Sequence, residues 1–165
     1  MIKNVLAFSE YELFDVISIL DESIALVYIH EGMKSSVNKN LGGIFYIKGL
    51  DFDIGEDKIE KRYVSEEEFV GLKNFIDNLD GKVSALIVCC GGGISRSAGV
   101  AEAISEYLNI NLNLWEISRF HPNILYYLRA CDVLGVPYSK EKLIELFDTR
   151  SRCSMFHCSA SRADF

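Results

Sequence analysis

One stretch of the sequence combines a cysteine, a glycine-rich turn and an arginine at a spacing that suits phosphate chemistry. It reads CGGGISRS and runs from Cys90 to Ser97. Glycines allow several backbone N–H groups to converge on one anion, and a helix beginning at Ser95 or Arg96 would add the positive end of its dipole. These donors favour a thiolate at Cys90, which makes it a candidate nucleophile. The planar guanidinium of Arg96 can hold two phosphoryl oxygens.

Other sites that use glycine loops or cysteines fit the sequence less well. The loop of nucleoside triphosphatases needs a lysine that is absent here, and a dinucleotide fingerprint needs a third glycine where Arg96 stands. The cysteines have no regular spacing and form no C-x-x-C pair, so neither a disulfide framework nor a structural zinc site is expected. We therefore expect no metal and no other cofactor. The five cysteines are Cys89, Cys90, Cys131, Cys153 and Cys158.

Hydrophobic periodicity places the CGGGISRS stretch between a buried strand and a helix. Residues 82–90 form a continuous apolar run that is typical of a parallel sheet, and residues 95–108 have a helical pattern. Further strands are predicted at residues 4–8, 23–30 and 44–50, and further helices at residues 9–20, 65–81, 121–135 and 139–147.

Two of the predicted helices begin with a capping box, in which a serine and a glutamate three residues later satisfy each other's backbone N–H groups. The pairs are Ser9 with Glu12 and Ser65 with Glu68. Because strands alternate with helices, the sequence predicts an α/β domain with a central, mostly parallel sheet flanked by helices. The half that begins at about residue 95 is predicted to be helical throughout.

Length and charge limit the class of protein. The chain has 165 residues, the size of one domain. We expect that domain at residues 1–148, followed by a disordered tail at residues 149–165, where periodicity is lost. The net charge of −7 argues against nucleic acid or an anionic membrane as a partner. No apolar run approaches the roughly 20 residues of a membrane span, and the N-terminus has no secretory pattern, so we expect a cytoplasmic protein.

The signature stretch resembles that of a known enzyme family. CGGGISRS is similar to the C-x-x-G-x-S-R-S motif of cysteine-dependent protein tyrosine phosphatases, and the segment SRFHPNILYYL resembles the dual-specificity branch of that family. In this resemblance Asn123 matches an asparagine that supports the phosphate-binding loop. The segment from Tyr46 to Asp53 is similar to the one in which a tyrosine precedes the general acid by seven residues. The resemblance extends over about residues 4–148.

The resemblance implies hydrolysis of phosphomonoesters on a phosphorylated protein or peptide, through a cysteinyl-phosphate at Cys90. Such a reaction needs an acid to protonate the leaving oxygen, and the same carboxylate can later activate water. Asp53 is the first candidate, with Asp51 and Asp57 as alternatives. Ser97 would assist the breakdown of the intermediate. The phosphate would be bound by the backbone and side chains of Gly91, Gly92, Gly93, Ile94, Ser95 and Arg96.

The sequence departs from the family in two ways. Cys89 stands where a histidine usually precedes the nucleophile, and the only tryptophan, Trp115, leaves no tryptophan-proline-aspartate loop. Two alternatives to a dual-specificity phosphatase follow. One is a pseudophosphatase that binds phosphate without turnover. The other is an enzyme similar to low-molecular-weight phosphatases or arsenate reductases, whose cysteine loop, however, lies near the N-terminus. The sequence does not indicate an oligomeric state.

The remaining cysteines and histidines are interpreted mainly as structural. Cys89 or Cys131 could trap an oxidised Cys90 as a disulfide, although burial is the simpler expectation for Cys89. His30 and His121 have no evident partners in the sequence, and we expect them to be structural or exposed.

Overall fold

Four strands precede the two longest helices in a computed structural model, which describes residues 1–32, 37, 40–50, 64–79, 81–146 and 148. The strands are β1 (Asn4–Ser9), β2 (Ile24–His30), β3 (Gly43–Lys48) and β4 (Ala85–Cys90). The α-helices are α1 (Glu10–Val16), α2 (Leu72–Asp77), α3 (Arg96–Tyr107) and α4 (Ile124–Leu134). Short 3-10 helices are η1 (Ile17–Ile19), η2 (Glu66–Phe69) and η3 (Leu114–Glu116). Residues 140–146 are also helical.

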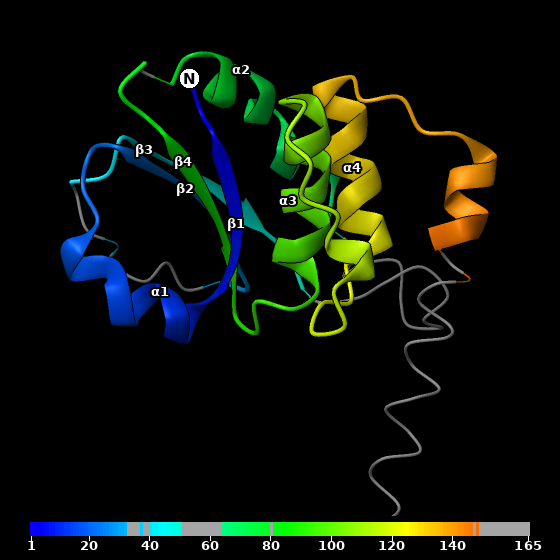
Figure 1. Cartoon of the computed structure of the whole chain (residues 1–165), viewed down its shortest axis with the longest axis horizontal. Coiled ribbons are helices and arrows are strands. Elements are labelled where there is room, and N and C mark those ends of the chain that lie inside the picture. Colours follow the sequence, from blue (N-terminus) through cyan, green and yellow to red (C-terminus); the bar gives the residue numbers. More distant parts are fainter. Residues whose placement is uncertain (33–36, 38–39, 51–63, 80, 147, 149–165) are drawn as a thin grey trace, which may run out of the picture.

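The strands form one parallel sheet of four, in the order β1-β4-β2-β3 (Figure 1). β4 is an inner strand, and its residue Leu86 pairs with Val5 on one side and Ala25 on the other. All six residues of β4 are buried, as expected for a strand covered on both faces. The described elements from α3 onward are all helical. The predicted α/β class with a parallel central sheet is therefore confirmed.

Helices cover both faces of the sheet. The connection from β1 to β2 crosses β4 in one direction, and the connection from β3 to β4 crosses β2 in the other. Because parallel crossovers are right-handed, α1 and α2 are expected on opposite faces. Figure 1 shows α1 on one side of the sheet and α3 with α4 on the other. Leu13 of α1 accordingly packs with Tyr28 and Cys89, whereas Cys90 belongs to the larger core beneath α2, α3 and α4.

One predicted helix differs in the structure. Residues 65–81 form η2 and the short helix α2 instead of one continuous helix, because Gly71 between them has a φ of +95° and breaks the helical path. The capping box predicted for Ser65 is also wrong, since its side chain makes no cap hydrogen bond. The carboxylate of Glu68 instead accepts a hydrogen bond of 3.0 Å from the backbone N–H of Lys48. That contact ties η2 to the end of β3.

The capping box predicted at Ser9 is confirmed. The Glu12 N–H donates to Ser9 Oγ at 3.1 Å, and the Ser9 N–H donates to Glu12 Oε2 at 2.7 Å. The box starts α1 at the point where β1 ends, so the chain turns sharply at the carboxyl edge of the sheet. Ser9 therefore lies at the same edge as Cys90, with which it pairs in register.

All four strands end at this carboxyl edge, which is where ligands bind in open parallel sheets. The residues that end them are Ser9, His30, Lys48 and Cys90. In the part of the chain that the structure describes, no helix is long and apolar enough to span a membrane. The predicted tail at residues 149–165 lies outside the described residues.

Candidate active site

The loop between β4 and α3 is held in a shape that only glycine permits at one position. Gly93 has a φ of +68°. A Cβ atom there would lie 2.3 Å from the backbone nitrogen of Ser9 and 2.7 Å from the carbonyl carbon of Phe8. The loop thus packs directly on the end of β1. This contact fixes the direction of the Gly93 N–H.

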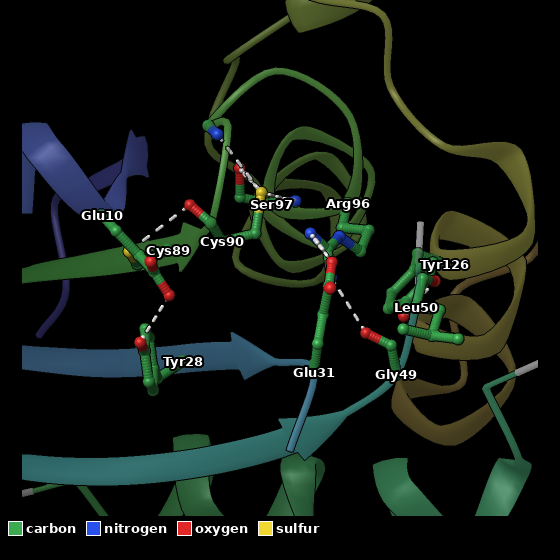
Figure 2. Close-up of polar contacts among 11 residues, drawn as sticks. Glu10, Tyr28, Glu31, Gly49, Leu50, Cys89, Cys90, Arg96, Ser97 and Tyr126 are labelled. Atoms are coloured by element: carbon green, nitrogen blue, oxygen red, sulfur yellow. Dashed lines mark hydrogen bonds and ion pairs between the residues drawn. The ribbon is translucent and has the colours of Figure 1, made fainter. Parts of the chain in front are cut away.

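The Cys90 sulphur lies at the centre of this loop. Its Sγ accepts hydrogen bonds from the backbone N–H of Gly93 at 3.3 Å and of Ser97 at 3.4 Å. It also lies 3.2 Å from Ser97 Oγ (Figure 2). The side chain is 1% exposed, which shields these donors from competing water. The loop therefore directs several donors at one buried sulphur, as a nucleophilic thiolate would require.

Arg96 occupies the first turn of α3 and reaches across the edge of the sheet. It is 4% exposed. Its Nη1 donates to the Gly49 carbonyl at 2.9 Å, and its Nη2 makes an ion pair of 2.9 Å with Glu31 Oε1. Figure 2 shows the guanidinium joined to both the Glu31 carboxylate and the Gly49 carbonyl. Arg96 thus connects the cysteine loop to the ends of β2 and β3.

Gly49 is also a position that requires glycine. A Cβ atom there would lie 2.3 Å from Tyr126 Oη, which itself donates to the Leu50 carbonyl at 3.0 Å. The segment after β3 is therefore clamped between α4 and the guanidinium of Arg96. The candidate general acids Asp51, Asp53 and Asp57 follow this segment and lie outside the described residues.

The segment before α4 supports the outer side of the cysteine loop. The backbone N–H groups of His121 and Asn123 donate to the carbonyls of Ile94 and Ser95, each at 3.0 Å. The Asn123 side chain caps α4 by accepting from the Tyr126 N–H at 3.2 Å. The Asn123 main chain thus contacts the cysteine loop, and its side chain also caps α4.

Cys89 faces away from the candidate site. It is fully buried among residues beneath α1, and this burial raises the pKa of its thiol well above the ordinary value. Cys131 of α4 is buried in the larger core, where desolvation raises its pKa to about 12. Both thiols are free and disfavoured as thiolates, so neither is suited to attack an oxidised Cys90.

A cavity of about 540 Å³ opens beside Arg96 and the cysteine loop. Its wall includes residues that sequence reasoning missed, because they come from the ends of β1 and β2 and the strand order was not known. His30, expected to be structural or exposed, is 6% exposed and packs against the rings of Tyr28 and Tyr46. The cavity is lined by Glu10, Ile29, His30, Glu31, Gly32, Gly91 and Arg96.

The structure brings most of the predicted site residues together at one edge. Cys90, Arg96 and Ser97 meet around the loop, with Asn123 behind it. Gly91 borders the cavity, and Gly92 has no heavy atom within 4 Å of the position that a Cβ would take. Within the described residues there is no group of three His, Cys, Asp or Glu side chains that could hold a metal ion.

Comparisons with protein-family models, with curated proteins and with solved structures found no match to this chain. A buried sulphur faced by N–H donors, with a guanidinium and a hydroxyl beside it, can attack an electrophilic centre that carries negatively charged oxygens.

Proposed function

We propose that this protein hydrolyses phosphomonoesters through a cysteinyl-phosphate intermediate, in the manner of a dual-specificity protein tyrosine phosphatase. The main support is the position of Cys90 Sγ. It accepts hydrogen bonds from the backbone N–H groups of Gly93 and Ser97, in a loop that leads directly into α3. A loop that surrounds a thiolate in this way also offers N–H donors to the oxygens of a phosphoryl group above it.

In the first step the Cys90 thiolate attacks phosphorus in line with the ester bond. The sulphur–phosphorus bond forms as the phosphorus–oxygen bond breaks, and the leaving oxygen takes a proton from Asp53, our candidate acid. The guanidinium of Arg96 stabilises the charge on the equatorial oxygens. The alcohol or phenol then departs, leaving a phosphate ester of the cysteine.

In the second step water attacks the same phosphorus and gives its proton to Asp53. The sulphur–phosphorus bond breaks, inorganic phosphate leaves, and the electron pair returns to the Cys90 sulphur. The hydroxyl of Ser97 lies 3.2 Å from that sulphur and can donate to it as charge develops. This contact supports the assignment of Ser97 to the hydrolysis of the intermediate.

The substrates would be phosphotyrosine and also phosphoserine or phosphothreonine in proteins or peptides. The proposal includes a cytoplasmic location. The described cysteines are free thiols, and a reducing compartment keeps thiols in that state. No cofactor enters either step, since the thiolate, the acid and water supply every group that the reaction needs.

The test is hydrolysis of 4-nitrophenyl phosphate by the parent and by Cys90→Ser. We expect Cys90→Ser to lose more than about 10³-fold in turnover while it still binds phosphate or vanadate. Cys131→Ser, which changes a buried thiol in α4, should keep its activity provided that it is folded by circular dichroism. Undiminished turnover by Cys90→Ser would exclude the mechanism. Phosphate binding by a parent without turnover would indicate a pseudophosphatase.

A further inference from the structure

The carboxylate of Glu31 is paired with Arg96, the side chain proposed to bind the phosphate. Glu31 follows β2 directly, and its Oε1 lies 2.9 Å from Arg96 Nη2. The same nitrogen would lie 3.5 Å from a Cβ placed on Gly91, so it is next to the cysteine loop. The Arg96 side chain is 5% exposed, whereas that of Glu31 is 55% exposed. The arginine is thus fixed, and the glutamate is the partner that can move.

A phosphate group that reaches the loop must share Arg96 with this carboxylate. Phosphate and Glu31 both carry negative charge, so they repel one another when they bind the same guanidinium. Among the described residues that line the cavity, Arg96 is the only arginine or lysine, and Glu10 adds a second carboxylate. Glu10 is held there by a hydrogen bond of 2.6 Å that the Tyr28 hydroxyl donates to it.

We propose that Glu31 makes the enzyme selective for phosphomonoesters that carry a cationic group beside the phosphate. This inference rests on the proposed function. Binding exchanges partners: the Glu31 carboxylate moves away from Arg96, the phosphate takes its place at the guanidinium, and the cation of the substrate pairs with Glu31. A neutral substrate leaves the carboxylate without a counter-ion, and an anionic substrate adds a further repulsion.

Three aryl phosphates test the exchange on the same reaction. O-phosphotyramine carries an ammonium group, 3-(4-phosphonooxyphenyl)propanoate carries a carboxylate at a similar distance, and 4-nitrophenyl phosphate carries no further charge. We expect kcat/KM of the parent to favour the ammonium compound over the carboxylate compound by about tenfold. Glu31→Gln should reduce that ratio to nearly one, mainly through KM.

Glu22→Gln is the matched control. Glu22 is 72% exposed, makes an ion pair of 3.5 Å with Lys82, and is not among the residues that line the cavity. Its replacement changes the net charge by the same amount. This variant should retain the ratio of the parent. If Glu31 merely positions Arg96, Glu31→Gln will slow all three compounds alike and keep the ratio, which would overturn the inference.

The outcomes separate this inference from the proposed function. If the parent hydrolyses all three compounds without a charge preference, the inference about Glu31 is overturned and the proposed phosphatase activity is retained. If none is turned over, calorimetric binding to Cys90→Ser decides: preference for the ammonium compound supports charge selection at a non-hydrolytic site, and equal binding or no binding overturns it.

Two natural sources share the required chemistry, a basic phosphopeptide and a small phosphorylated amine. Phosphotyrosine peptides with arginine or with glutamate on both sides of the phosphotyrosine distinguish them. A preference for the arginine peptide, with kcat/KM above that of phosphotyramine, identifies the peptide source. A preference for phosphotyramine over both peptides identifies the small amine.

Discussion

At the scale of single residues, the candidate site depends on positions that accept no larger side chain. Gly93 is the clearest case, because its backbone rests on the end of β1 while its N–H points at the Cys90 sulphur. Its neighbour Gly92 is also a glycine but has a different environment, with open space where a Cβ would lie and no positive φ. The two glycines therefore form a matched pair for mutation.

We expect Gly93→Ala to lower the free energy of unfolding by more than about 2 kcal/mol and to reduce phosphate binding. The added Cβ would meet the Ser9 backbone, which cannot give way as a flexible side chain would. Denaturant unfolding and calorimetry measure the two effects. Gly92→Ala should change the unfolding free energy by less than about 1 kcal/mol. Equal losses in both variants would show that the close approach to β1 does not determine the shape of the loop.

Ser97→Ala is expected to slow the second chemical step. Without the hydroxyl 3.2 Å from the sulphur, we expect kcat to fall by about 10²-fold and the cysteinyl-phosphate to accumulate, visible as a burst of released phenol. Ser105→Ala is the control, because it removes a buried hydroxyl from the same helix that donates only to the Glu102 carbonyl at 2.7 Å. If Ser97→Ala hydrolyses the substrate at the parental rate, Ser97 has no role in the mechanism.

Sequence reasoning predicted the residues of the loop better than the residues of the cavity. Cys90, Arg96 and Ser97 lie within one contiguous motif, so local spacing was sufficient to bring them together. Glu10 and Glu31 come from the ends of different strands and meet the loop only because β4 lies between β1 and β2. Strand order depends on tertiary packing, and no local pattern in the sequence encodes it.

At the scale of secondary-structure elements, α3 and α4 are packed so closely that one residue has no room for a methyl group. A Cβ on Gly99 of α3 would lie 2.4 Å from the Asn123 carbonyl at the start of α4. The close approach allows the segment before α4 to reach the carbonyls of Ile94 and Ser95. A small residue in α3 thus determines how the loop is supported.

We expect Gly99→Ala to destabilise the protein by about 1 to 3 kcal/mol, although alanine is the better helix former by about 1 kcal/mol. The clash with the Asn123 backbone outweighs the gain in helix propensity. Thermal unfolding measures the effect, and Gly81→Ala, with nothing within 4 Å of its Cβ, should leave the stability nearly unchanged. A more stable Gly99→Ala variant would mean that the helices can separate at no cost.

The elements differ in how well their sequences predicted them. The end of α4 was predicted to within one residue, because Gly135 ends the helix in the left-handed conformation. The helix begins at Ile124, three residues later than predicted, because Asn123 and not the segment at Pro122 caps it. Residues 65–81 were predicted as one helix because their apolar spacing is continuous. The break at Gly71 depends on packing against neighbouring elements, including the bond between Glu68 and the end of β3, and such contacts are not visible locally.

At the scale of the whole molecule, a buried acid in α3 couples stability to pH. Glu102 is 5% exposed and accepts a hydrogen bond of 2.8 Å from the Leu114 N–H. Desolvation raises its pKa above the ordinary value of 4.5; repulsion by Glu106 adds to the rise, and the Leu114 bond and the charge of Lys142 oppose it. The folded state therefore holds a proton there that the unfolded chain has already released.

This shift predicts that part of the stability is present below pH 4.5 and is lost as the pH rises through the folded-state pKa. Glu102→Gln does not titrate at this position and keeps an oxygen for the Leu114 N–H. We expect its stability relative to the parent to increase from about pH 4 to about pH 8 in thermal unfolding. Glu116→Gln, at an exposed position nearby, should track the parent. A constant difference across this range would refute the assignment.

The bonds from the segment before α4 to Ile94 and Ser95 also have a consequence for folding. The loop is completed by β1, the end of β3 and α4, which are far apart in the sequence. The loop is therefore complete only after α4 has docked, so recovery of activity during refolding should follow the last tertiary step and lag behind helix formation. In a mutational screen scored by activity, substitutions at the start of α4 would then reduce activity as catalytic mutations do. Their cause would be a failure to assemble the loop and not the loss of a catalytic group.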